Sequence, residues 1–210
     1  MYLFFGYCAF GLIDHLRRYL PSILCFGRVV IGQSGVTIGR GLDLGNPPTG
    51  ATGQSPAKLD LKALFQEEEL IPELSDWLLS VEGVKRASAL ESLDSSGLTD
   101  DELTITRKQQ HLMFNDVYDY MEEKTRILLT KPDVKAKFGV VDWDNLPRNV
   151  KDVLVDLTYR GDNSPRTREG FVPALVDFEL LIFKEKVMDV NNTLWRGVDL
   201  NRRERREKYL

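Results

Sequence analysis

The sequence predicts an α+β chain that is predominantly α, with a small Gly-rich β segment near the N-terminus and a helical C-terminal lobe. Two observations support this fold class. Over residues 26–45, runs of β-branched residues are broken by glycines, which is typical of short strands joined by turns. From residue 59 onward, apolar residues recur at intervals of three and four, which indicates helices. There is no βαβ alternation and no internal repeat, so a parallel-sheet fold is not expected.

Composition places the chain among ordinary globular proteins. Its 210 residues are 29% charged and 42% hydrophobic, with a formal net charge of −4. We expect a single domain over residues 1–210, in which residues 1–58 form an N-terminal helix, a β lobe and a loop, and residues 59–210 form the helical lobe. The acidic balance argues against a nucleic-acid partner. Two Cys, two His and no CxxC argue against a metal or cofactor, which leaves carboxylates and hydroxyls for any chemistry.

The first sixteen residues, MYLFFGYCAFGLIDHL, are unusually apolar. The apolar run stops at Asp14, short of the ~20 residues that a membrane span needs, so no stable span is expected. No basic region precedes Tyr2, as it would in a secretory signal. Three interpretations remain open: a first helix packed into the core, a degenerate signal or anchor, and a start that is wrongly assigned or truncated.

The helices expected in the middle of the chain follow a loop over residues 46–58, which is rich in Pro, Gly, Ser and Thr. The spacing of Leu61, Leu64 and Phe65 predicts a first helix, and Pro72 fits the first turn of a second. The residues 99–102, TDDE, have the pattern of a capping box and predict the start of a new helix. A long helix is expected from about 110 to 129. The glutamates at 67–69 are interpreted as a solvated face.

The C-terminal part predicts four more helices. One begins at Asn145, with Pro147 just inside, and ends at Gly161. A second is indicated by the helical spacing of its apolar residues, a third is short and centred on one tryptophan, and the last is the basic tail, residues 201–210. The tail arginines are divided between ion pairs at a buried edge and a surface that favours polyanions. The apolar residues of the second and third helices are Phe171, Leu175, Phe178, Ile182 and Trp195.

The strongest candidate site lies in residues 34–45, which read SGVTIGRGLDLG. Thr37 and Asp43 are six residues apart on a turn-rich strand, where flanking glycines let a bulky ligand approach the backbone. A hydroxyl and a carboxylate directed toward one cleft can bind and orient a water, and the carboxylate can act as its base. The alternative is structural: an Asp that caps a turn and a strand Thr that packs. No GxxxxGK[ST] and no GxSxG occurs.

These twelve residues resemble the active-site signature of the pesticin-type, lysozyme-like muramidases, which are relatives of the phage-type lysozymes. The resemblance extends over about residues 19–210. Residues 146–161 and 171–175 are similar to successive helices of that family, and Trp195 followed by residues 201–206 is similar to its closing W…NRxxR helix. The resemblance implies a lysozyme-like fold and hydrolysis of the β-1,4 bond between N-acetylmuramic acid and N-acetylglucosamine.

By motif match, the resemblance assigns catalytic roles to Thr37 and Asp43, and Tyr19, Gln33 and Arg160 are substrate-binding candidates by position. The family's general acid is a Glu on the first helix, but no Glu occurs before Glu67. Asp14 is the acidic residue in that region. It is interpreted as the catalytic acid, as a bystander, or as a sign that the true N-terminus is missing. As the acid, it would lie about 6.5–9.5 Å from Asp43 in a single-displacement, inverting mechanism.

Two function classes therefore remain. The first is a peptidoglycan hydrolase, and the alternative is a lysozyme-like module that binds glycan without cleaving it because the family's Glu is absent. Bacterial peptidoglycan is the expected partner in both cases, and an immunity or inhibitor protein is a further partner for the enzyme. A protein with this substrate would be secreted, periplasmic or released at lysis.

Overall fold

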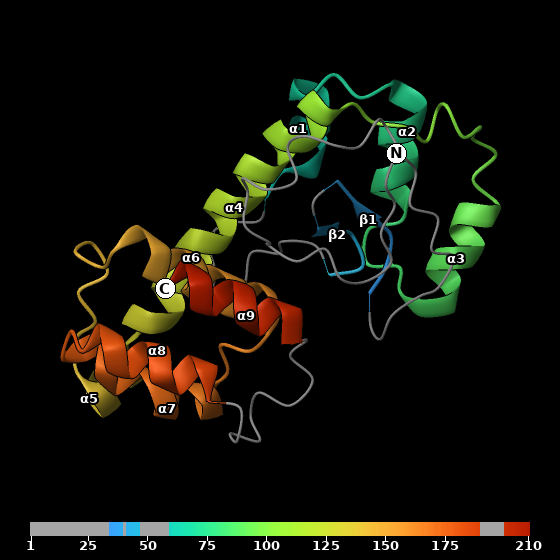
Figure 1. Ribbon diagram of the computed structural model, residues 1–210. Coiled ribbons are helices and arrows are strands. Elements are labelled where there is room, and N and C mark those ends of the chain that lie inside the picture. The colour runs from blue at the N-terminus through green and yellow to red at the C-terminus, as the bar shows by residue number, and fades with distance from the viewer. Residues whose placement is uncertain (1–33, 40, 47–58, 190–199) are drawn as a thin grey trace. The chain divides into compact units, whose positions relative to one another are not determined.

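The computed structural model describes residues 34–39, 41–46, 59–189 and 200–210. Within these ranges a two-stranded antiparallel sheet precedes a series of helices (Figure 1), which confirms the α+β, predominantly α class. The strands are β1 (Thr37–Ile38) and β2 (Leu42–Asp43). The helices are α1 (Leu61–Glu67), α2 (Pro72–Ser80), α3 (Arg86–Asp94), α4 (Arg107–Thr130), α5 (Pro132–Phe138), α6 (Arg148–Tyr159), α7 (Pro165–Val176), α8 (Leu180–Met188) and α9 (Leu200–Tyr209).

The chain divides into two compact units. Unit 1 comprises Met1–Gly50 and Ala57–Tyr118, and unit 2 comprises Ala51–Pro56 and Asp119–Leu210. Helix α4 begins in unit 1 and ends in unit 2. Both units contain fully buried apolar side chains, which provide the main driving force for folding.

In unit 1, strands β1 and β2 form a short hairpin. Thr37 pairs with Asp43 and Ile38 pairs with Leu42. Gly39 and Gly41 at the turn have φ values of 62° and 109°, a region that glycine enters without steric cost. Residues 83–86 run along the base of the hairpin: the Gly83 amide donates to the Leu44 carbonyl and the Arg86 amide to the Ser34 carbonyl.

The buried apolar residues of unit 1 come from the hairpin and from the helices. The side chains of Ile38 and Leu42 line a small apolar cavity together with Met113, Phe114 and Val117 of α4. One face of the hairpin therefore lies against α4. Among the described residues of this unit, the other fully buried large side chains belong to α1, α2 and the segment after β2: Phe65, Leu74, Leu78 and Leu44.

Helix α4 starts later than the sequence pattern predicts. Thr99 and Glu102 do form the reciprocal bonds of a capping box, but residues 100–103 make only a turn, so the expected helix start at Thr99 is wrong. A second box closes seven residues later, where the Thr106 amide donates to Gln109 Oε1 (2.8 Å) and the Gln109 amide donates to Thr106 Oγ1 (3.2 Å). The helix continues from Arg107 to Thr130, in agreement with the long helix predicted there.

The glutamate run at the end of α1 is not uniformly solvated. Glu67 and Glu69 are exposed, but Glu68 retains only 8% of its accessible surface. Desolvation raises the pKa of Glu68, and the negative charge of Asp116 raises it further. The expected solvated face is therefore correct for two of the three side chains.

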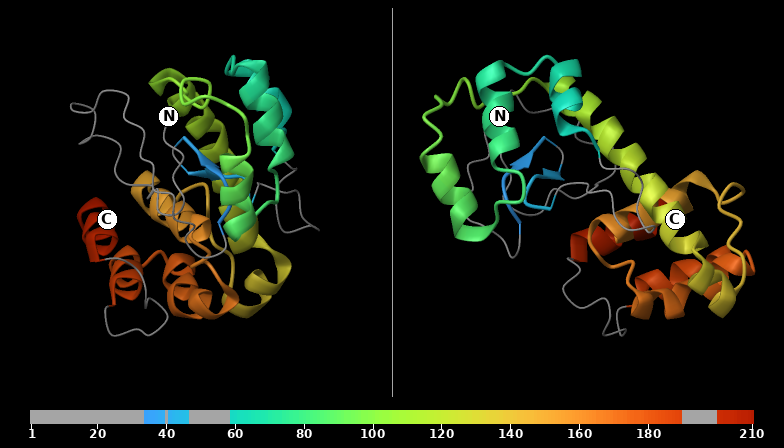
Figure 2. Two further views of the ribbon diagram at one scale, coloured as in Figure 1. Left: turned by 90° about the vertical axis from the view of Figure 1, so that its right-hand side faces the viewer. Right: turned by 180° about the vertical axis from the view of Figure 1, so that it is seen from behind.

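Unit 2 has a well-defined hydrophobic core. The rings of Phe171 on α7 and Phe183 on α8 meet edge to face, with 6.1 Å between their centroids. Helices α7 and α8 lie side by side in each view (Figures 1 and 2). Helix α6 begins at Arg148, with Pro147 at its N-cap and Gly161 just beyond its end. The buried side chains that α6 adds to this core are those its spacing predicts: Val150, Val153, Leu154 and Leu157.

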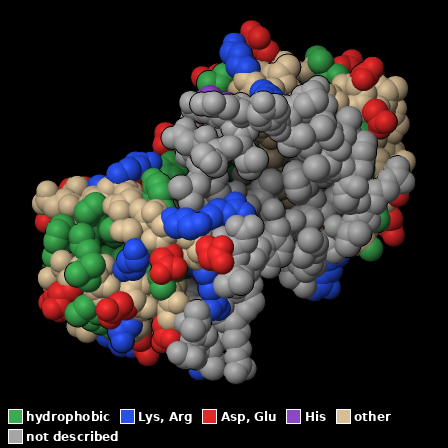
Figure 3. All heavy atoms as spheres, in the orientation of Figure 1, with side chains coloured by type: hydrophobic (Ala, Val, Ile, Leu, Met, Phe, Trp, Pro, Cys, Tyr) green, Lys and Arg blue, Asp and Glu red, His purple; other side chains and the backbone are tan. Residues whose placement is uncertain are grey.

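The single helix predicted from Phe171 to Ile182 is wrong, because the chain forms two helices there. Helix α7 ends at Val176, and Phe178 adopts a φ of 57°, a left-handed conformation that an α-helix cannot continue through. Phe171 and Leu175 are buried as expected, but Phe178 and Ile182 are exposed. Leu181 is exposed as well. Figure 3 shows hydrophobic side chains among charged ones on the surface of this unit.

The basic tail is helix α9, and it is anchored to α6 by buried ion pairs. Asp156 accepts hydrogen bonds from Nε and Nη2 of Arg202, the shortest at 2.5 Å, and another from Arg206 Nε at 2.7 Å. All three residues are buried. The part of the prediction that placed tail arginines in ion pairs at a buried edge is confirmed for Arg202 and Arg206.

Several predicted features lie outside the described residues: the apolar segment 1–16, the strand residues before Ser34 and the short helix at Trp195. Within the described ranges, no helix has the length and hydropathy needed to cross a membrane.

Candidate functional site

The hairpin places Thr37 and Asp43 next to each other. They are direct cross-strand partners, so their side chains project from the same face of the two-stranded sheet. Cβ atoms of such partners are about 4.5–5.5 Å apart. Ile38 and Leu42, the adjacent pair, point to the opposite face, toward α4. The predicted hydroxyl–carboxylate pair is therefore assembled by the strand register itself.

Within the described part of the chain, three hydrogen bonds hold the carboxylate of Asp43. Its Oδ1 accepts from the backbone amides of Gly35 at 3.0 Å and Gly45 at 2.9 Å. Its Oδ2 accepts from Asn46 Nδ2 at 2.9 Å. Oδ1 thus faces the base of the hairpin, whereas Oδ2 faces the exposed Asn46. A carboxylate oxygen can accept two hydrogen bonds, so Oδ2 retains the capacity to bind a water.

Glycine is required at positions 35 and 45 because the two backbones touch. A Cβ atom on Gly35 would lie 2.2 Å from the Val84 carbonyl oxygen and 2.5 Å from the Cα of Gly45. A Cβ on Gly45 would lie 2.4 Å from the Gly35 nitrogen. This close approach is what allows a single carboxylate oxygen to bind both amides. The two glycines at the ends of the signature therefore form the support of Asp43.

Thr37 is 5% exposed, and its hydroxyl makes a long contact of 3.4 Å to the Gly35 carbonyl oxygen. A contact of that length is a weak hydrogen bond, so the hydroxyl can still turn to donate to or accept from another group. Among the described residues, no group of three His, Cys, Asp or Glu side chains is arranged to hold a metal ion. The chemistry that this face offers is that of a carboxylate and a hydroxyl.

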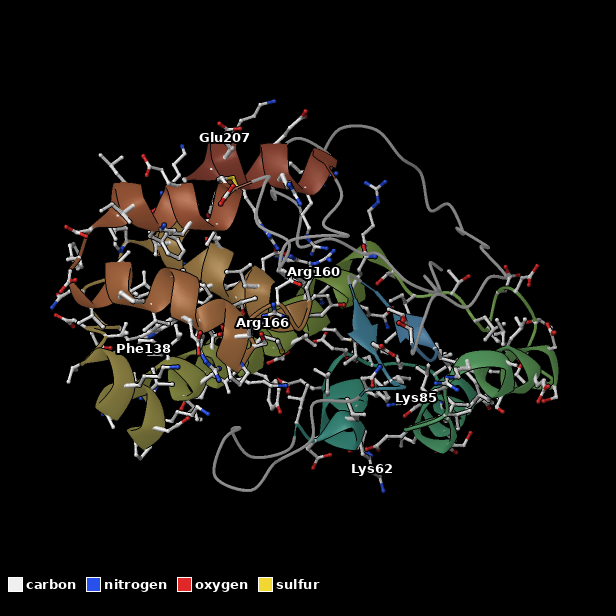
Figure 4. All side chains as sticks on the ribbon, turned by 90° about the horizontal axis from the view of Figure 1, so that it is seen from below. Lys62, Lys85, Phe138, Arg160, Arg166 and Glu207 are labelled. Atoms are coloured by element: carbon white, nitrogen blue, oxygen red, sulfur yellow. The ribbon has the colours of Figure 1, made fainter. Side chains whose placement is uncertain are left out.

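Two residues that follow Asp43 in a chain of hydrogen bonds were not identified from the sequence. Asn46 donates to Asp43, and its Oδ1 accepts from Lys85 Nζ at 2.6 Å. Lys85 lies beside the hairpin in Figure 4 because its backbone pairs with Gly35. Asn46 directly follows the signature, so its proximity could have been suspected. Lys85 is 39 residues away along the chain, and no local pattern indicates the contact.

Arg160, one of the substrate-binding candidates, belongs to unit 2. It is the C-cap residue of α6 (Figure 4). Its Nε donates to Asp162 Oδ2 at 2.9 Å. Arg206 Nη2 lies 3.6 Å from the same carboxylate oxygen. Arg160 is therefore part of a polar cluster at the end of α6, and its role toward a substrate stays a prediction.

Asp14, Tyr19 and Gln33 lie outside the described residues. The expected separation between the carboxyl groups of Asp14 and Asp43 therefore stays a prediction, as do the substrate contacts of Tyr19 and Gln33. The small cavity between the hairpin and α4 has a volume of about 10 Å³ and an apolar lining, so it is too small for a sugar ring.

Fold and site together define an α+β protein, predominantly helical, with a Thr–Asp pair on one face of a glycine-supported hairpin. A family model matches residues 28–207, which is most of the chain. The chain therefore belongs to the family described as Domain of unknown function (DUF8812). Comparison with curated proteins and with solved structures found no match.

Proposed function

We propose that this protein is a muramidase with a lysozyme-like fold, which hydrolyses the β-1,4 bond between N-acetylmuramic acid and N-acetylglucosamine in peptidoglycan. The observation that supports this function best is the cross-strand pair of Thr37 and Asp43, with Oδ1 of Asp43 bound by two backbone amides. A general base has to be held in position while one of its oxygens remains able to reach a water. The hairpin meets both requirements.

In the proposed reaction, the two oxygens of Asp43 have separate tasks. Oδ1 is bound to the hairpin, and Oδ2 accepts a proton from a water molecule that the Thr37 hydroxyl helps to orient. The oxygen of that water forms a bond to the anomeric carbon as the glycosidic bond breaks. A general acid, for which Asp14 is our candidate, gives its proton to the leaving oxygen. This single displacement inverts the anomeric configuration.

A glycan-binding module that does not cleave is the second candidate. The observation that favours it is that the three hydrogen bonds which described residues donate to the Asp43 carboxylate come from its own hairpin and loop. An aspartate used only to close a turn would be bound in the same way. Such a protein would bind peptidoglycan through the same surface and release no product.

The deciding experiment measures reducing ends released from purified peptidoglycan by the full chain and by matched variants. Asp43→Asn retains an oxygen that can accept from the glycine amides but removes the base, so we expect activity to fall at least ~100-fold. Thr37→Val keeps the shape of the side chain and removes the hydroxyl, and a smaller loss is expected. Asp142→Asn is the control, because Asp142 is an exposed aspartate in unit 2 that is bound by Asn145.

Each of the other outcomes would exclude one of the proposed functions or the proposed position of the active site. Binding of peptidoglycan without release of reducing ends would establish the glycan-binding module. Cleavage that survives in Asp43→Asn would place the active site elsewhere. In an active enzyme, NMR of the freshly released sugar tests the mechanism: an α-anomer indicates single displacement, whereas a β-anomer indicates a covalent intermediate.

A further inference from the structure

The side chain of Asp43 is contacted on its solvent-facing oxygen by one residue, Asn46, among those the structure describes. The Asn46 amide nitrogen is 2.9 Å from Oδ2, and its backbone amide also donates to the Asp43 carbonyl at 3.1 Å. The residue is therefore attached to Asp43 by both its main chain and its side chain. Rotation of the carboxylate about its Cβ–Cγ bond would break the bond to Asn46 and the bonds to the glycine amides together.

Asn46 is in turn oriented by Lys85. The ammonium group donates to Asn46 Oδ1 at 2.6 Å, the short distance expected of a charge-assisted hydrogen bond. An amide has one acceptor end and one donor end, so fixing the oxygen on Lys85 directs the NH₂ group toward Asp43. The lysine thus selects the orientation in which Asn46 donates to the carboxylate.

The position of Lys85 is set by the backbone around it. The backbone of Lys85 pairs with Gly35. On either side of Lys85, the amides of Gly83 and Arg86 also donate hydrogen bonds to the hairpin segment. Arg86 has a φ of 59°, so the chain turns sharply directly after Lys85. The ammonium group therefore extends from a fixed point at the base of the hairpin (Figure 4).

From these contacts we propose that Asn46 is a positioning residue for the Asp43 carboxylate, and that Lys85 acts through Asn46. The proposal rests on the muramidase function, in which Oδ2 must present a free lone pair to the water. Gly35 and Gly45 fix Oδ1, and Asn46 occupies one acceptor position of Oδ2. The second acceptor position of Oδ2 therefore points in one fixed direction, in which it can bind the water. Neither Asn46 nor Lys85 needs to contact the substrate.

The test combines kinetics with a double-mutant cycle on the full chain. We expect Asn46→Ala to lower kcat about tenfold with little change in KM, because a misdirected base slows the reaction without weakening substrate binding. Lys85→Met should give a smaller loss, and Lys85→Arg should recover part of it by restoring a cationic donor. Since Lys85 acts through Asn46, adding Lys85→Met to Asn46→Ala should have no further effect.

Two variants serve as controls. Asn145→Ala removes an equivalent exposed bond from an asparagine to the aspartate three residues before it, but in unit 2. Lys62→Met removes an exposed lysine of α1. Both should keep the kcat of the parent chain. An unchanged kcat in folded Asn46→Ala, or fully additive losses in the double variant, would overturn the proposal.

A second readout separates this proposal from the function on which it rests. The backbone amide NMR signals of Gly35 and Gly45 report the position of Oδ1 whether or not the protein cleaves anything. Displacement of both signals in Asn46→Ala, but not in Asn145→Ala, would support the positioning role. Unchanged signals would overturn it. An inactive parent chain would overturn the muramidase function alone, and the glycine signals would then decide the role of Asn46.

Discussion

At the scale of single residues, Asp43 shows how one side chain can serve both fold and site. Its Oδ1 closes the base of the hairpin by binding the amides of Gly35 and Gly45, and the same bonds fix the direction of Oδ2. From the sequence alone, the structural and the catalytic interpretations of this aspartate are alternatives. The geometry makes them compatible, because the two oxygens of the carboxylate have different environments.

The contact between the two glycines leads to a prediction on stability. Gly45→Ala would place a methyl group against the backbone of Gly35, so we expect the free energy of unfolding to fall by about 1–3 kcal/mol. Gly170→Ala is the matched control: it lies in α7 with nothing near its Cβ position, and it should gain up to ~1 kcal/mol from better helix propensity. Urea unfolding of both variants measures the difference. Equal free energies of unfolding for the two variants would show that the backbones at residues 35 and 45 can move apart without loss of stability.

Tyr209 provides a pH-dependent prediction. Desolvation, followed by the hydrogen bond to Asp152, raises its pKa to about 12 from an ordinary value of 10.0. The folded protein therefore holds this proton more tightly than the unfolded chain does. The stabilisation is complete below pH 10 and is lost as the pH rises toward 12. We expect the Tm to decrease less steeply from pH 10 to 12 in Tyr209→Phe than in the parent chain. Parallel Tm curves for the two proteins would contradict this assignment.

At the scale of elements, the sequence predicted most helices well because their signals are local. The apolar spacing within α1, α2 and α6 corresponds to side chains that are buried in the structure. Boundaries were harder to predict. A capping box at Thr99 closes only a turn, and an unbroken helical spacing from Phe171 to Ile182 conceals the left-handed Phe178. Both failures arise because a local pattern does not report whether the following backbone continues in the helical conformation.

The pairing of Thr37 with Asp43 was predictable in the same local sense, because the two residues are placed symmetrically about the glycine-rich turn. The contact between Lys85 and Asn46 was not, since 39 residues separate them. The pairing of Asp156 with Arg202 and Arg206 was not predictable either, because an arginine-rich helix does not indicate which carboxylate will bind it. Contacts between distant segments depend on the packing of the whole unit.

The start of α4 gives a prediction at this scale. Thr106→Ala removes the N-cap bond of a long helix, so we expect a loss of about 1 kcal/mol in the free energy of unfolding. Thr99→Ala removes the same kind of bond from an isolated turn and should cost less than ~0.5 kcal/mol. Chemical denaturation followed by circular dichroism compares them. A larger loss in the free energy of unfolding for Thr99→Ala would mean that the hydrogen bonds of the turn stabilise the protein more than the N-cap of α4 does.

At the scale of the whole molecule, the division into two units predicts that a substitution in the core of one unit destabilises mainly that unit. Asp156→Ala leaves two buried guanidinium groups without their carboxylate, which should cost about 3–5 kcal/mol. We expect amide hydrogen exchange to accelerate more in α6, α7 and α8 than in α1 and α2. Glu123→Ala, which removes an exposed ion pair with Arg126, should cost at most ~1 kcal/mol. Equal acceleration in both units would show that they unfold together.

The closure of the hairpin by Asp43 also bears on the order of events during folding. Gly35 and Asp43 are eight residues apart, and loops of this size close within about 10–100 ns. The bonds from Arg202 and Arg206 to Asp156 span 46 and 50 residues, so their loop-closure entropy is larger. The Thr–Asp pair can therefore form before the C-terminal helix docks. Because a two-stranded hairpin is only marginally stable by itself, the pair becomes persistent when residues 83–86 and α4 pack against the hairpin.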